Sequence, residues 1–148
     1  MHFDLIVIGM GLSGLMAART AVEMGKRVLI VGKGMGTLVM FSNTIDLLGE
    51  LPLAEKVKEA LPRWIEDHPE HPYGKAGFEK IDDALSSFNA FFPPPYSFQA
   101  REERNSLVPT GAGTLRTTYL IPSTMMKGVT IMKSVTPGCC VVLRSIRE

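Results

Sequence analysis

The hydrophobic and polar residues at the start of the chain follow a pattern that predicts a strand, a helix and a second strand. Phe3 to Ile8 is a compact apolar run that ends in glycines, typical of a parallel strand covered on both faces. From Leu12 to Met24 apolar residues recur at helical spacing, and Gly25 is placed to end that helix. Arg27 to Val31 predicts the next strand. Together they form a βαβ unit, which indicates an α/β fold class.

The pattern changes to that of a helical insert between about residues 50 and 95. Leu53 to Leu61 has amphipathic spacing, and we expect Pro62 to break or restart the helix there. Aromatic and aliphatic residues then recur at steps of three and four, which predicts a helix over Gly77 to Phe92. Three consecutive prolines should stop this helix.

Three other stretches complete the expected organisation. Leu38 to Leu48 mixes apolar and small polar residues, which predicts a loop followed by a short helix. Arg116 to Ile121 and Val129 to Met132 return to strand-like composition. We therefore expect strands on both sides of the helical insert.

Composition narrows the class of protein. The 148 residues are 45% hydrophobic, enough for a globular core, and 16 basic residues against 15 acidic ones leave no basic face for nucleic acid. The longest apolar runs are strand-sized, far below the roughly 20 residues of a membrane span. The N-terminus lacks the cationic leader of a secretory signal.

The two cysteines, Cys139 and Cys140, are adjacent, so neither a long-loop disulfide nor a Cys-x-x-Cys motif is expected. These features favour the cytoplasm.

The turn between the first strand and helix has the spacing Gly9-x-Gly11-x-x-Gly14. Gly9 permits a tight turn, Gly11 lets the backbone approach a pyrophosphate, and Gly14 lets helix and strand pack closely. Leu12 and Ser13 begin the helix, whose free N–H groups and dipole suit a phosphate, and Ser13 adds a hydroxyl. The motif lies between a strand and a helix, so it predicts a Rossmann-like FAD/NAD(P)-binding fold.

The residues after the second strand depart from the usual ribose site. An acidic side chain that binds the ribose 2′-hydroxyl is expected there, and this chain has Gly32 and Lys33 instead. Lys33 could bind a flavin phosphate or a 2′-phosphate, or be a solvated loop residue. A nicotinamide-dependent dehydrogenase should show the acidic residue, so its absence counts against that class. The usual recognition of the FAD ribose is also missing, whereas FMN, which has no adenosine ribose, is compatible with this site.

Four segments, in this order and spacing, resemble the B subunit of anaerobic glycerol-3-phosphate dehydrogenase. They are Phe3 to Ile8 with the following glycines, Phe41 to Gly49, His71 to Tyr73, and Pro109 to Leu120. The glycine motif is common to many flavoproteins, whereas the second and fourth segments are more specific to this family.

The resemblance covers about residues 1–133, which we expect to form the N-terminal part of a flavin- or dinucleotide-binding domain. Family members are much longer, so the fold should be incomplete at its C-terminal end. Residues 134–148 no longer resemble the family, and we expect an atypical tail, from a frameshifted or truncated end.

The resemblance implies a flavoprotein oxidoreductase subunit that uses FMN or FAD. It would work beside the catalytic A subunit of the enzyme and its iron–sulfur, membrane-anchoring C subunit. It would then lie in the cytoplasm, peripheral to the inner face of the membrane. Glycerol 3-phosphate would be oxidised to dihydroxyacetone phosphate, with electrons passing to a quinone. A folded fragment without a competent cofactor site is the non-catalytic alternative.

The resemblance also supplies candidate flavin contacts. Ser42 and Asn43 follow the second strand, where related flavoproteins bring small polar residues to the flavin; capping of a helix at Ile45 to Leu48 is the alternative. Arg116 could bind a phosphate or form a structural ion pair. His68 and His71 flank prolines, a poor geometry for a metal site, so no metal is expected. No catalytic residue is assigned.

Overall fold

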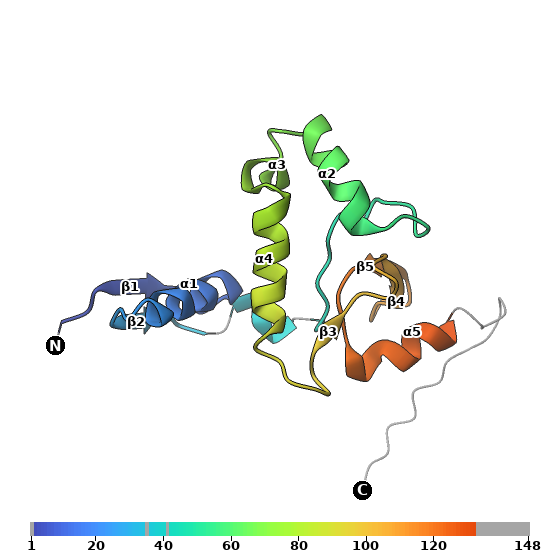
Figure 1. Cartoon of the computed structure of the whole chain (residues 1–148). Coiled ribbons are helices and arrows are strands. Elements are labelled where there is room, and N and C mark those ends of the chain that lie inside the picture. The colour runs from blue at the N-terminus through green and yellow to red at the C-terminus, as the bar shows by residue number, and fades with distance from the viewer. Residues whose placement is uncertain (1, 35, 41, 133–148) are drawn as a thin grey trace, which may run out of the picture. The chain divides into compact units, whose positions relative to one another are not determined.

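The computed structural model describes residues 2–34, 36–40 and 42–132 (Figure 1). The chain divides into two compact units, Met1–Ser42 and Asn43–Glu148. The predicted atypical tail and the Cys139-Cys140 pair lie outside the described residues.

The first unit is the predicted βαβ unit. Strand β1 (Leu5–Ile8) and strand β2 (Val28–Val31) pair in parallel and in register, and helix α1 (Leu12–Glu23) joins them. A 3-10 helix, η1 (Gly36–Met40), follows. Gly25 has φ +74° just after α1, so the prediction that it ends the helix is confirmed. The same parallel pair continues beyond the strand, since the Gly9 N–H donates to the Val31 carbonyl at 2.8 Å.

The second unit begins with helices α2 (Val57–Asp67), α3 (Pro72–Ala76) and α4 (Phe78–Asn89) (Figure 1). The prediction that Pro62 breaks the first of these helices is wrong, because α2 continues through it. Proline removes one helical hydrogen bond. Val57 and Leu61, which are 0% and 1% exposed, anchor the preceding turn by burial and outweigh that loss.

Helix α4 confirms the prediction from three- and four-residue spacing. Phe88 packs against Phe92 and Phe98 with ring centroids 5.0 and 5.5 Å apart. At the end of the helix Asn89 exchanges two hydrogen bonds with the backbone of Phe98, at 2.6 and 2.8 Å. These contacts hold the end of α4 against strand β3 (Phe98–Gln99).

The remaining strands form two small antiparallel sheets. β3 pairs with β6 (Ile121–Pro122), and β4 (Ser106–Pro109) pairs with β5 (Leu115–Thr118). The prediction of a strand at Arg116 to Ile121 is thus confirmed in two pieces. In the described part of the chain, the sheets have two strands each. The α/β class therefore holds, but among the described strands only β1 and β2 show the parallel pairing of a Rossmann-like sheet.

Two sequence predictions fail in this unit. Val129 to Met132 was expected as a strand, but it belongs to helix α5 (Met126–Met132), which follows the 3-10 turn η2 (Ser123–Met125). Val129 is 4% exposed and shares a buried cluster with Val108 and Ile121, so tertiary burial overrides its β-favouring composition.

The short helix expected at the end of Leu38 to Leu48 is also absent from the described residues there. Instead Ile45 forms an antiparallel bridge with Leu120, through hydrogen bonds of 2.9 Å in both directions. The backbone groups that a helix would pair internally are used in this bridge.

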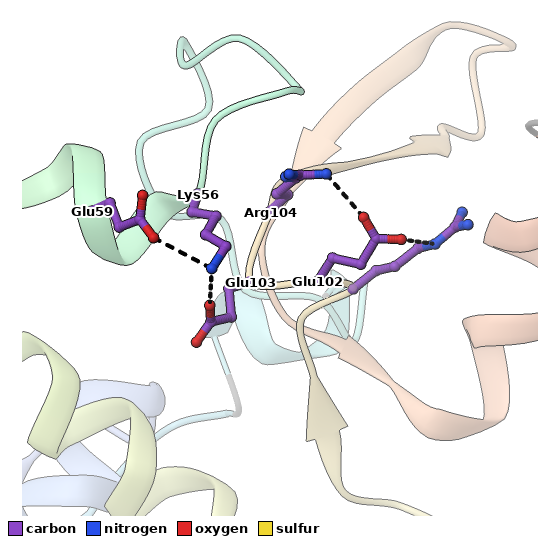
Figure 2. A network of polar contacts seen from close by, with 6 residues as sticks. Lys56, Glu59, Glu102, Glu103 and Arg104 are labelled. Carbon is purple, nitrogen blue, oxygen red and sulfur yellow. Dashed lines mark hydrogen bonds and ion pairs between the residues drawn. The ribbon is translucent and has the colours of Figure 1, made fainter.

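A charged network joins the start of α2 to the turn before β4. Figure 2 shows Lys56 between Glu103, at 3.1 Å, and Glu59, at 3.3 Å, and Glu102 paired with Arg104 at 2.9 Å. The hydrogen bonds that Lys56 donates to Glu103 and, to a lesser extent, to Glu59 raise the pKa of Lys56. Glu102 and Glu103 have φ of +51° and +59°, so the network surrounds a sharp turn.

Across the described residues, no helix is long and apolar enough to cross a membrane.

Candidate functional site

The three glycines of the fingerprint lie at the junction of β1 and α1, and each has a different local geometry. Gly9 has φ +109°, a conformation that side chains disfavour. A Cβ on Gly14 would strike the Gly9 carbonyl oxygen and lie 3.3 Å from Val7 Cγ1, so helix and strand pack too closely there for a side chain. Gly11 has an ordinary φ of −73°, and a Cβ there would meet nothing within 4 Å.

The open space at Gly11 lies at the N-terminus of α1. Gly11 is the N-cap residue, and the first helical hydrogen bond to it comes from Leu15 N–H to the Gly11 carbonyl, at 3.0 Å. The N–H groups before that bond have no partner within the helix. The first turn contains no acidic side chain, and Leu12 and Ser13 are exposed. The junction thus fits a pyrophosphate, which needs backbone donors and close approach.

Gly32 and Lys33 follow β2 directly. A Cβ on Gly32 would clash with the Met10 side chain, whose Sδ lies 2.6 Å from that position. Gly32 therefore lets the loop before α1 approach the end of β2. Lys33 is exposed, and its contact with a phosphate stays a prediction.

Ser42 ends the first unit and Asn43 begins the second. Both residues are exposed, and Asn43 has φ +54°. The alternative that they cap a helix at Ile45 to Leu48 is wrong, because that segment is not helical. Their contact with a flavin stays a prediction.

The segment after Asn43 is held by side chains from the β4–β5 region. Arg116 donates to Thr44 Oγ1 at 2.6 Å and pairs with Asp46 at 3.1 Å. Thr117 donates to the Gly49 carbonyl at 2.8 Å, and Thr118 donates to the Ile45 carbonyl at 3.2 Å. The prediction of a structural ion pair for Arg116 is confirmed.

A second polar cluster, not expected from the sequence, joins α2 to α4. Lys58 pairs with Asp82 at 2.6 Å, and this hydrogen bond raises the pKa of Lys58. Burial raises the pKa of Tyr119, which is 3% exposed. Both shifts keep these groups protonated at neutral pH, so neither is poised to act as a general base. No sequence signal marked the cluster, since its members come from α2, from α4 and from the residues between β5 and β6.

His68 and His71 lie in an aromatic cluster around Trp64. His68 stacks on Trp64 with ring centroids 4.1 Å apart, and its Nδ1 donates to the Trp64 carbonyl at 2.9 Å. His71 Nδ1 accepts from the Tyr73 N–H at 3.1 Å and caps α3. Within the described ranges, no three His, Cys, Asp or Glu residues are grouped to hold a metal ion.

Comparison with known proteins agrees with this geometry. The chain is 36% identical over 129 residues to the B subunit of anaerobic glycerol-3-phosphate dehydrogenase from Actinobacillus succinogenes, covering 84% of this chain and 30% of that protein. The B subunit of the Vibrio cholerae serotype O1 enzyme is 38% identical over 91 residues, covering 60% of this chain and 21% of that protein. The B subunit of the Haemophilus ducreyi enzyme is 31% identical over 128 residues, covering 84% of this chain and 30% of that protein.

The chain therefore spans at most about a third of the length of these relatives. No solved structure matches it. The family described as FAD binding domain matches residues 4–143, which confirms FAD within the expectation of FMN or FAD. With the glycine junction at its start and this match over nearly its whole length, the chain belongs to the FAD-binding domain family.

Proposed function

We propose that the chain is the flavin-binding part of an oxidoreductase subunit that works like the B subunit of anaerobic glycerol-3-phosphate dehydrogenase. The observation that carries the proposal is the β1–α1 junction, where Gly9 turns the chain, Gly14 brings helix and strand together and Gly11 leaves open space at the helix N-terminus. The family match and the named relatives supply the cofactor and the reaction class.

In this proposal the pyrophosphate of FAD lies over Gly11 and accepts hydrogen bonds from the N–H groups of Leu12 and Ser13. The partial positive charge at the start of α1 stabilises the phosphates without a basic side chain. Lys33, Ser42 and Asn43 are proposed as further contacts. The bound flavin ring supplies the two-electron redox chemistry.

The proposed substrate and partners rest on the resemblance to this enzyme. Glycerol 3-phosphate is the proposed substrate, oxidised to dihydroxyacetone phosphate with electrons passing to a quinone. The proposed partners are a catalytic A subunit together with an iron–sulfur, anchoring C subunit, which would hold the protein at the inner face of the membrane. The base that takes the substrate's hydroxyl proton is proposed to lie outside the described residues, because none of the clusters above offers one.

The test compares two serine variants of the purified chain. Gly11→Ser places a side chain in the proposed pyrophosphate space, while its ordinary φ and its N-cap position accommodate serine without strain. Gly34→Ser is the matched control, since Gly34 also faces open space without a positive φ. Each chain is incubated with FAD, desalted, and examined by visible absorption.

We expect Gly11→Ser to retain at least about tenfold less FAD than Gly34→Ser, the loss of about 1.4 kcal/mol or more. Far-UV circular dichroism should stay unchanged in both variants, because a Cβ added at either glycine would meet no other atom within 4 Å. Equal FAD retention by the two variants would contradict the placement of the pyrophosphate.

The substrate proposal has its own test, because it can fail while flavin binding holds. A tagged copy of the chain is expressed in its source cells and purified with its partners under anaerobic conditions. Addition of glycerol 3-phosphate should bleach the flavin absorption of the purified complex, whereas glycerol should not. Bleaching by neither compound would exclude this substrate for the complex.

A further inference from the structure

A pocket in the second unit brings together residues that the proposed flavin site does not use. Asp46, Leu48 and Glu50 come from the segment after Asn43, and His71 and Tyr73 come from the start of α3. Trp64 of α2 completes the wall, and the cavity has a volume of about 210 Å³. Since a water molecule takes up about 30 Å³ in the liquid, this is room for a small organic group.

Polar contacts hold the acidic wall of this pocket, formed by Asp46, Leu48 and Glu50, in place. Asp46 is held by Arg116 at 3.1 Å, and the Leu48 carbonyl accepts from Asn105 Nδ2 at 3.0 Å. Leu48 has φ +48°, a conformation that a leucine keeps only when its surroundings impose it. The wall is therefore set before any ligand arrives.

The aromatic wall is equally ordered. His71 lies edge-on to Trp64 and to Tyr73, with ring centroids 4.8 Å apart in both pairs. Trp64 and Tyr73 are 6.1 Å apart, also in an edge-to-face arrangement. Trp64 and Tyr73 are rings of the types that attract organic cations, while His68 stacks on Trp64.

The charge of the pocket points the same way. Asp46 is already paired with Arg116, so the uncompensated charge of the lining is that of Glu50. Glu50 is exposed and has no ion pair among the described residues, and the described lining itself includes no lysine or arginine. His71 Nδ1 accepts the Tyr73 backbone N–H at 3.1 Å, so this ring nitrogen is already occupied. A phosphate would meet repulsion here, whereas a cation would meet both a carboxylate and aromatic rings.

We propose that this pocket binds an organic cation, an ammonium or guanidinium group. That chemistry could come from a free small amine or from a basic side chain of a partner protein. The proposal does not depend on the flavin function, because no residue of the glycine junction takes part in it.

Trp64 is the single tryptophan of the chain, so its fluorescence reports this pocket directly. The full chain is titrated with tetramethylammonium chloride, with sodium chloride at equal ionic strength as the reference. We expect a saturable change with tetramethylammonium that sodium chloride, sodium phosphate and glycerol do not produce.

Two variants locate the binding. Glu50→Gln should weaken tetramethylammonium binding roughly threefold, the size of an exposed charge interaction, while the matched control Glu55→Gln, which is exposed and outside the pocket, should not. Tyr73→Leu should weaken binding by a similar factor through loss of a ring. The same variants are checked for folding by circular dichroism.

A further arm separates the two sources of the cation. An arginine amide and a glycine-flanked arginine pentapeptide are titrated in the same way. Equal binding of both supports a partner's side chain, and loss of binding in the peptide supports a free amine. A response to phosphate or glycerol but not to tetramethylammonium would overturn the proposal, as would equal binding by Glu50→Gln and Glu55→Gln.

Discussion

Asn105 offers a sharp test of how the second unit is held together. Its side chain is 5% exposed, and its Nδ2 donates to the carbonyls of Leu48 and Leu47, at 3.0 and 3.4 Å. Its Oδ1 is buried without a hydrogen-bond partner. The substitution Asn105→Asp keeps the shape of the side chain but replaces the donor group by an oxygen that faces two carbonyl oxygens.

The expected loss depends on pH. When the new carboxyl is protonated it keeps one donor, so one of two hydrogen bonds is lost, at a cost of about 1 kcal/mol. Burial and the facing carbonyls raise the pKa of this carboxyl, and each unit adds about 1.4 kcal/mol to the cost at neutral pH. A rise of about two units therefore gives a loss of about 4 kcal/mol at neutral pH.

The direction in which the stability of Asn105→Asp changes with pH follows from proton binding. Between the ordinary carboxyl pKa of about 3.9 and the raised value, the folded variant binds more protons than the unfolded variant. Its stability therefore falls as the pH rises through this window, relative to the unsubstituted chain at the same pH.

Urea unfolding followed by Trp64 fluorescence measures this, because Trp64 belongs to the second unit. The free energy of unfolding of Asn105→Asp and of the unsubstituted chain is compared at about pH 4.5 and about pH 7.5. The first value lies near the lower end of that pH window and the second lies above it. Asn43→Asp is the exposed control and should change the stability by less than about 0.5 kcal/mol at both. A small, pH-independent loss in Asn105→Asp would refute the reasoning.

Three further predictions concern stability. Leu61→Ala removes a side chain that is 1% exposed and should cost about 2–5 kcal/mol in urea unfolding, against less than about 1 kcal/mol for Leu53→Ala at a 41% exposed site; similar losses would contradict the buried position of Leu61. Burial raises the pKa of Tyr119, so above pH ~10 the folded chain keeps the phenol proton that the unfolded chain loses. The chain therefore loses stability as the pH rises further. Tyr119→Phe should make that alkaline decline shallower, and equal declines would count against it. Gly14→Ala should increase amide hydrogen exchange in α1, since its Cβ would strike the Gly9 carbonyl, and unchanged protection would show that the junction has more room.

The elements that could be predicted are those whose signal is local. The first strand, α1 and α4 are each marked by apolar residues within one segment, and the glycine turn is a contiguous motif. The expectation that the first strand is covered on both faces is wrong for the described residues, because Leu5, Ile6 and Ile8 are exposed. Val129 shows the limit of this reasoning, because its helix is decided by burial against Val108 and Ile121, which lie outside its own segment. Pro62 shows another, since burial of its neighbours keeps α2 intact.

The candidate site divides in the same way. The glycine fingerprint is readable because three residues within one turn carry the geometry. The hydrogen bond from Arg116 to Thr44 joins residues 72 positions apart, so the sequence could name an ion pair and a phosphate contact for Arg116 but not the partner. The Trp64 pocket needs α2, α3 and the segment after Asn43 together, and no single one of these segments predicts it.

The central claim is that the β1–α1 junction binds a flavin. The most direct test is the visible absorption spectrum of the purified chain after separate incubation with FAD, FMN and NAD, each followed by desalting. The account predicts retained bands near ~375 and ~450 nm, which arise from the oxidised flavin ring, with FAD and no retained NAD. A chain that retains none of the three would be a folded unit without a competent cofactor site, and the claim would be contradicted.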